Sequence, residues 1–265
     1  MQPLKKKNSS TRKRPADLSF HETKYTDDRH LAYLKALEAY FESAPGNSLE
    51  KLENFPKHVP RTAILRLLVK YELFKQVLEV QGSVVECGVL HGGGLMTWAQ
   101  LSAILEPANH QRKVIGFDTF AGFPSIADED RGSVSDFIGK GQLAVDSYDN
   151  LLEAIQIFDM SRYLGHIGKV ELVRGDILET LPAFIEHNQH LVVSLLYLDV
   201  DLFEPTRAAL KHLVPRMPRG AIVAFDELNM PTWPGETEAV LSELGLRNLA
   251  IRRSPLGTSI SYAVI

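Results

Sequence analysis

Val84–Gly94, with the sequence VVECGVLHGGG, decides the fold, because an apolar run there ends in a glycine-rich turn. A helical pattern begins directly afterwards, near Leu95. Glycines let a chain turn tightly and approach a ligand without a clash at Cβ. A short buried strand, a glycine turn and a helix form the first unit of an α/β fold, in which ligands bind beyond the carboxyl ends of the strands.

Further short runs of apolar or β-branched residues follow, separated by helical segments, which is the pattern of a parallel sheet covered on both faces. Two later candidate strands lie so close in the chain that they can pair only antiparallel. We therefore predict an α/β fold, a Rossmann-like class I methyltransferase sheet of five parallel strands plus a C-terminal antiparallel hairpin, flanked by helices. The predicted strands are Val84–Cys87, Val114–Phe117, Val170–Val173, Val192–Leu198, Ala221–Phe225, Leu249–Arg252 and Ser259–Val264.

The chain before the sheet has a different character. Apolar residues recur at helical spacing over His30–Ser43 and again from Arg61 to Val80. After the second predicted strand, glycines, prolines and acidic residues indicate either a mobile lid over bound substrates or a static surface loop. The predicted organisation is a disordered basic tail over 1–20, a helical extension over 21–82, and the cofactor-binding domain over 83–265 with a lid over 119–165.

Composition excludes several classes of protein. The formal net charge of -4 gives the body of the chain no electrostatic footprint for nucleic acid. Cys87 is the single cysteine, so no intramolecular disulfide is expected. No apolar run is long enough to span a membrane, and the simplest expected compartment is the cytoplasm. The sequence leaves open whether the protein forms a homo-oligomer.

The residues that end the strands point to S-adenosylmethionine (SAM) as the cofactor. The glycine spacing differs from that of dinucleotide binders, and Asp118 follows Gly88 by 30 residues rather than about 20, which argues against NAD. Glu86 suits a ligand with an ammonium and a sulfonium group, and Asp118 can accept bonds from both ribose hydroxyls. Asp176, after the third strand, is a candidate for the adenine amine, although a strand-end aspartate also serves often as a helix cap. We predict Gly88, Gly92 and Gly93 as the cofactor turn.

Four carboxylates follow the fourth and fifth predicted strands, which should be neighbours. So many like charges raise one another's pKa and destabilise the fold unless a cation neutralises them. Oxygen ligands without histidine or cysteine favour Mg²⁺ over Zn²⁺. The alternative is that these residues cap a helix or are solvated. The carboxylates are Asp199, Asp201, Asp226 and Glu227.

Three motifs resemble the macrocin O-methyltransferase (TylF-like) family of metal-dependent class I enzymes, which methylate sugar hydroxyls. The resemblance covers roughly Pro60 to Ala239. It implies that Asp199, Asp226 and Glu227 hold the metal, that Asp201 is the base, and that Thr119 joins Asp118 at the cofactor. The motifs are VExGVxxGG from Val85, DTFxG from Asp118 and LDxDLFEPT from Leu198.

The sequence departs from the family at two places, and both concern the acceptor or the metal. Members often carry Asp-Asp where this chain has Asp226-Glu227, and an aromatic-basic pair where it has Leu90-His91. The expected activity is Mg²⁺-dependent O-methylation of a sugar or glycosylated small molecule. A catechol-like phenol as acceptor, or a non-catalytic nucleotide-binding protein, are the alternatives. The roles of His91 and Trp233, which is either an acceptor platform or a loop anchor, stay open.

Overall fold

The computed structural model describes residues 27–131 and 139–265, so the predicted basic tail and part of the predicted lid lie outside the described residues. The chain divides into two compact units, Met1–Pro60 and Arg61–Ile265. The first unit contains α1 (Asp28–Ser43), α2 (Ser48–Glu53) and the short 3-10 helix η2 (Phe55–Lys57). Asp27 caps α1 by accepting a hydrogen bond from the His30 N–H at 2.7 Å.

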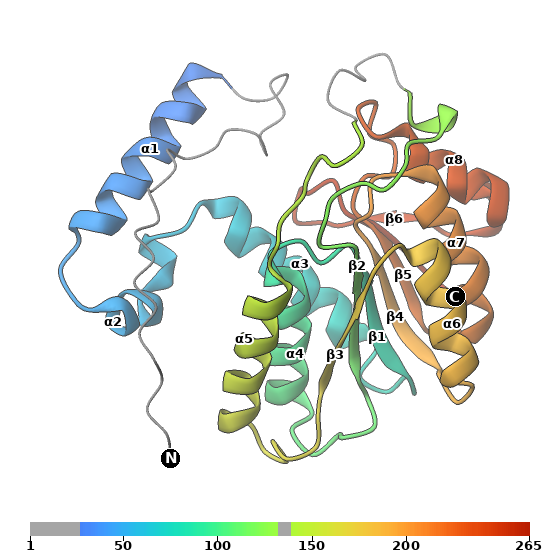
Figure 1. Cartoon of the computed structure of the whole chain (residues 1–265), viewed down its shortest axis with the longest axis horizontal. Coiled ribbons are helices and arrows are strands. Elements are labelled where there is room, and N and C mark those ends of the chain that lie inside the picture. Colours follow the sequence, from blue (N-terminus) through green and yellow to red (C-terminus); the bar gives the residue numbers. More distant parts are fainter. Residues whose placement is uncertain (1–26, 132–138) are drawn as a thin grey trace. The chain divides into compact units, whose positions relative to one another are not determined.

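The second unit is a seven-stranded sheet with helices on both faces (Figure 1). The strand order is β3-β2-β1-β4-β5-β7-β6, in which β1 to β5 are parallel and β7 pairs antiparallel with both β5 and β6. The predicted fold class is therefore confirmed. The strands are β1 (Ser83–Cys87), β2 (Val114–Asp118), β3 (Val170–Arg174), β4 (Val193–Leu198), β5 (Ile222–Phe225), β6 (Arg252–Arg253) and β7 (Ser261–Val264).

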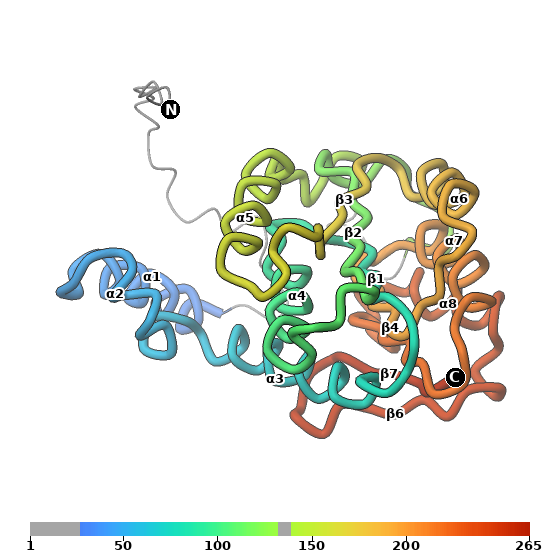
Figure 2. The backbone as a smooth tube through the Cα atoms, turned by 90° about the horizontal axis from the view of Figure 1, so that it is seen from below, coloured from blue at the N-terminus to red at the C-terminus, as the bar shows by residue number. Residues whose placement is uncertain are grey.

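Two hydrophobic clusters hold the helices against the sheet. Figures 1 and 2 show α3, α4 and α5 on one side and α6, α7 and α8 on the other. Because side chains alternate along a strand, Val84 packs under the first group of helices and Val85 under the second. The helices are α3 (Arg61–Gln76), α4 (Gly93–Leu105), α5 (Tyr148–Ser161), α6 (Ile177–His187), α7 (Phe203–Leu213) and α8 (Pro234–Glu243), with 3-10 turns η3 (Asp128–Asp130), η5 (Val214–Arg216) and η6 (Leu246–Asn248).

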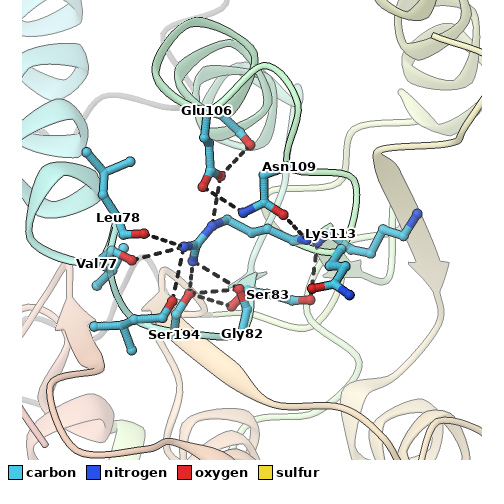
Figure 3. A network of polar contacts seen from close by, with 12 residues as sticks. Val77, Leu78, Gly82, Ser83, Glu106, Asn109, Lys113 and Ser194 are labelled. Atoms are coloured by element: carbon cyan, nitrogen blue, oxygen red, sulfur yellow. Dashed lines mark hydrogen bonds and ion pairs between the residues drawn. The ribbon is translucent and has the colours of Figure 1, made fainter. Parts of the chain in front are cut away.

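The second helix ends at Gln76, one turn before the predicted Val80, and a buried arginine binds carbonyl groups of the segment that follows it. The guanidinium of Arg112, which is 3% exposed, donates to the carbonyls of Val77 at 3.0 Å, Leu78 at 3.4 Å and Val80 at 3.0 Å. Figure 3 shows Val77 and Leu78 together with Gly82, which directly precedes β1, and Ser194, whose carbonyl and hydroxyl oxygens accept from the same guanidinium. This clamp lies at the amino ends of the strands, opposite the edge where the ligand site is expected.

The last predicted hairpin forms with a shorter first strand than expected. In this first strand, β6, only Arg252 and Arg253 pair with β7, so the start of the predicted strand Leu249–Arg252 lies outside the sheet. Within the described residues, no helix combines the length and the hydropathy that crossing a membrane requires.

Candidate active site at the carboxyl ends of the strands

The glycine turn after β1 brings the expected cofactor site directly against the expected metal site. Gly88 has φ +89° and Gly92 has φ +84°, conformations that favour glycine. A Cβ on Gly88 would lie 1.8 Å from the carbonyl oxygen of Asp199. Helix α4 begins at Gly93, two residues earlier than predicted, so its first N–H groups face the mouth of the sheet.

Asp118 ends β2 and ties two loops together. Its Oδ2 accepts hydrogen bonds from the N–H groups of Val89 at 2.7 Å and Leu90 at 2.8 Å, and its Oδ1 accepts one from Phe120 at 2.6 Å. Leu90 and Phe120 both have positive φ, so this carboxylate stabilises backbone that non-glycine residues rarely adopt. A carboxylate offers about four acceptor positions, so capacity for a ribose hydroxyl remains.

Two other predicted cofactor residues take part in local structure. Asp176 caps α6, because its side chain accepts from the Leu178 N–H at 3.0 Å. The Thr119 hydroxyl donates to the Gly122 carbonyl at 2.7 Å and accepts from the Ala121 N–H at 3.1 Å. Their contacts with SAM stay predictions.

The Glu86 side chain is buried between α3 and α4, and its contact with SAM stays a prediction. It is 2% exposed, lies 3.2 Å from the Lys70 ammonium and accepts a hydrogen bond from the indole N–H of Trp98. Burial raises the pKa of the Glu86 carboxyl, and Lys70 opposes that shift. A Cβ on Gly94 would lie 2.3 Å from Glu86 Oε1, so the start of α4 rests on this carboxylate.

The three predicted metal ligands come together. Asp199, Asp226 and Glu227 each offer one oxygen, and these oxygens all lie within 4.8 Å of one another. Asp226 is 1% exposed; its Oδ1 accepts from the Tyr197 hydroxyl at 2.5 Å and its Oδ2 lies 3.3 Å from Arg66 Nη2. Burial raises the pKa of Asp199 well above its usual range, and Asp226 adds to the shift.

Glu227 shows that this cluster suits a cation. Burial and then Asp226 raise the pKa of its carboxyl, and its buried Oε2 has no hydrogen-bond partner in the described residues. A buried oxygen without a donor is costly unless a ligand satisfies it. The donors are all hard oxygens, as Mg²⁺ prefers, so the residues present fit the predicted ion.

Asp201 lies beside the three carboxylates without belonging to their group. It is 9% exposed, has φ +63° and raises the pKa of Asp199 and Glu227. A non-glycine residue in this conformation is uncommon and persists where its surroundings hold it, often at functional sites. The Phe203 N–H, two residues later, donates to Asp130 at 2.7 Å, which fixes the end of the Asp201 loop.

Sequence reasoning missed three residues of this site. Glu236, in the first turn of α8, is fully buried, and its Oε1 accepts from the Glu227 N–H at 3.1 Å. Burial and Asp226 raise the pKa of Glu236. Arg66 and Lys70 come from α3, and their spacing of four residues on one helix was the available signal, because such residues share a face.

Trp233 and His91, whose roles the sequence left open, differ in exposure. Trp233 is 9% exposed, and its ring centroid lies 6.1 Å from that of Phe123 in the segment after β2. This pairing of two loops supports the anchor interpretation of Trp233. His91 is exposed in the glycine turn.

Comparisons with known proteins give one family and several related structures. Residues 66–241, more than half of the chain, match the macrocin-O-methyltransferase (TylF) family. A crystal structure of CalS11, a calicheamicin methyltransferase, is 35% identical, with 91% of this chain and 94% of that chain covered and a TM-score of 0.85. A search of curated proteins gives no match.

Two more solved structures are similar. The apo structure of CalS11, described as a TDP-rhamnose 3'-O-methyltransferase, is 32% identical, with 91% of this chain and 96% of that chain covered and a TM-score of 0.78. The O-methyltransferase NovP is 24% identical over 76% of this chain and 79% of that chain, with a TM-score of 0.60, and shares the fold.

Proposed function

The chain belongs to the macrocin-O-methyltransferase (TylF) family, and from that premise we propose that it methylates a hydroxyl of a sugar or glycosylated small molecule with the help of Mg²⁺. It is a SAM-dependent O-methyltransferase. The observation that carries the proposal is the contact between the glycine turn at Gly88 and Asp199, which joins a cofactor turn to a cluster of three carboxylates.

The glycine turn and Asp118 are proposed to bind and orient the cofactor. When bound, SAM supplies an electrophilic methyl group, which the acceptor oxygen takes as the carbon–sulfur bond breaks and S-adenosylhomocysteine is left. Gly88 and Gly92 allow the backbone to approach the ligand, and the N–H groups at the start of α4 can bind polar groups of the cofactor. Asp118 keeps this turn in shape through Val89 and Leu90.

Asp199, Asp226 and Glu227 are proposed to hold Mg²⁺. A divalent ion lowers the pKa of a hydroxyl that binds it and fixes the orientation of that hydroxyl. Tyr197 holds Asp226 through its hydroxyl, and Glu236 holds the backbone of Glu227, so two of the three proposed ligands are fixed by buried neighbours.

Asp201 is proposed to accept the proton that the acceptor hydroxyl loses as the new carbon–oxygen bond forms. Its loop is held at one end by the β4 strand and at the other by the bond from Phe203 to Asp130. Placing a base, an acceptor and a methyl donor at contact distance supplies much of the rate enhancement in such a reaction, because the cost of bringing them together has already been met on binding.

The first acceptors to test are nucleotide-activated deoxysugars. The similar CalS11 is described as a TDP-rhamnose 3'-O-methyltransferase. Methyl transfer from SAM to TDP-rhamnose, free rhamnose and catechol should be compared by mass spectrometry of the products. Methylation of catechol alone would refute the sugar acceptor and leave the methyltransferase activity standing.

The metal is tested by chelation. We expect methyl transfer to stop in EDTA and to return when Mg²⁺ is added. Thermal stability should also rise with Mg²⁺, because a ligand that binds the folded state stabilises it. Full activity in EDTA, with dialysed protein, would exclude the metal from the reaction.

The roles of the carboxylates are tested by isosteric amides. Asp201→Asn cannot take the proton, so kcat should fall roughly 10²–10⁴-fold, the usual worth of general base catalysis, with little change in metal affinity. Asp199→Asn removes a charged ligand, so excess Mg²⁺ should restore part of its rate. Glu227→Gln should behave like Asp199→Asn if Glu227 binds the metal despite its longer side chain. Rescue of Asp201→Asn by Mg²⁺ would instead make Asp201 a ligand.

A further inference from the structure

Helix α3 places two cations one turn apart on the face that it turns to the site, but the two are held very differently. Lys70 is 5% exposed, lies 3.2 Å from Glu86 Oε2, and sits 3.4 Å from the ring centroid of Tyr197 and 4.5 Å from that of Trp98. The side chain of Arg66 is 59% exposed. Lys70 is therefore fixed by an ion pair and two aromatic rings, whereas Arg66 can swing into solvent without disturbing the core.

Arg66 reaches the cluster at one particular atom, Asp226 Oδ2, at 3.3 Å. The other oxygen of Asp226 accepts the hydroxyl of Tyr197 at 2.5 Å, and Tyr197 is 1% exposed, so this bond stays in place. Oδ2 is the oxygen of Asp226 that Arg66 contacts, so a cation that binds Asp226 there meets the guanidinium.

The two cations exclude each other at this oxygen. A guanidinium and a divalent ion within about 4 Å repel each other by several kcal/mol even at the effective dielectric constant of a protein surface. Moving Arg66 takes a charge partner from the buried Asp226 carboxylate, and a metal ion bound at Oδ2 would replace that partner. Moving the ion away from Asp226 would remove one of its three protein ligands.

We propose that Arg66 is a built-in counter-ion, which neutralises Asp226 before the metal arrives and is displaced from it when Mg²⁺ binds. The proposal rests on the proposed metal dependence. Arg66 is a positioning residue in this scheme, because it acts through Asp226. It holds the Asp226 carboxylate in place before Mg²⁺ binds, and it sets the Mg²⁺ affinity by competing for one oxygen of that carboxylate.

The proposal predicts the sign of an affinity change. Arg66→Gln removes the competitor, so the Kd for Mg²⁺ should fall about 3- to 10-fold, which corresponds to about 0.6–1.4 kcal/mol. Arg66→Lys keeps the positive charge and should stay close to the wild type. The variant Lys75→Gln changes a cation on the same helix that pairs with Glu72 at 3.3 Å, and should leave the affinity unchanged.

Calorimetric titration of MgCl₂ into each full-length protein measures this directly, at a mildly alkaline pH that keeps the carboxylates ionised. Melting temperatures in EDTA and in Mg²⁺ are the second measurement. Arg66→Gln should melt below the wild type in EDTA, because its carboxylates have lost their counter-ion, and should gain more from Mg²⁺. Because each protein is compared with itself in EDTA and in Mg²⁺, the increase in melting temperature tests the displacement of Arg66 even if the variant is less stable than the wild type.

Any other result of the Mg²⁺ titration would overturn the proposed displacement of Arg66. Weaker Mg²⁺ binding by Arg66→Gln would show that Arg66 orients Asp226 and stays in place, and an unchanged Kd would show that the two cations do not compete. Either result overturns the displacement while the metal dependence stands. A wild type that binds no Mg²⁺ at all refutes the proposed metal and the displacement together, which distinguishes the two failures.

Discussion

Gly88→Ala should damage stability, cofactor binding and metal binding at once. The substitution puts a Cβ 1.8 Å from the carbonyl oxygen of Asp199, in a residue with φ +89°. The backbone conformation costs an alanine roughly 1–2 kcal/mol, and relieving the overlap costs about 1–3 kcal/mol more. The Asp199 N–H donates to the Cys87 carbonyl at 2.9 Å, so β1 and β4 cannot separate freely.

A loss of about 2–5 kcal/mol should lower Tm by roughly 4–20 °C in a domain of this size. Calorimetric titrations should show weaker binding of both SAM and Mg²⁺, because the backbone of a proposed metal ligand must move. Gly168→Ala is the matched control, since nothing lies within 4 Å of its added Cβ and its φ is not in the left-handed range. A Gly88→Ala protein as stable as Gly168→Ala, with both affinities intact, would refute the close approach of the two sites.

Three other predictions follow from single contacts. Asp118→Ala should weaken SAM binding by about 1.5–3 kcal/mol, the range for hydrogen bonds to a charged group, and unchanged affinity in calorimetry would remove Asp118 from the site. Asp130→Ala frees the Phe203 N–H and should lower kcat more than it raises KM, whereas Asp128→Ala, in the same turn but exposed, should match the wild type. Burial lowers the pKa of Lys169 to about 8. The unfolded chain therefore binds more protons between about pH 8 and 10.4, so stability should rise across that window and keep its lower value below it. Lys169→Met should show no such rise when denaturant unfolding is followed against pH.

The fold could be predicted because the parallel strands are short, mainly apolar or β-branched runs that are followed or ended by a glycine or a carboxylate. Val84–Cys87 is buried on both faces, so it reads as a strand without any partner in view. The end of α3 could not be predicted in this way. The carbonyls of Val77 and Val80, which follow α3, bond to Arg112 more than 30 residues away in the chain, and helical periodicity continues through Val80 regardless.

The candidate site could be predicted only where its residues end strands. Asp199 and Asp226 follow β4 and β5, which are neighbours, so the order of the strands places them together. Glu86 shows the limit of that reasoning, because a residue inside a strand points to one face or the other. Its side chain faces Lys70, and only the packing of α3 on that face determines this.

The charges that sequence reasoning missed explain why a divalent ion suits this place. Lys70 and Glu86 neutralise each other within the core, which leaves Arg66 as the cation of α3 that faces the carboxylates. These carboxylates belong to strand ends and to the first turn of α8, and burial raises the pKa of several of them. The Arg66 guanidinium compensates a single charge at Asp226, so the remaining negative charge still attracts a cation. The proposed metal ion would bring two charges to these oxygens in place of Arg66, and it would bind near the buried Oε2 of Glu227, which no hydrogen bond in the described part of the chain satisfies.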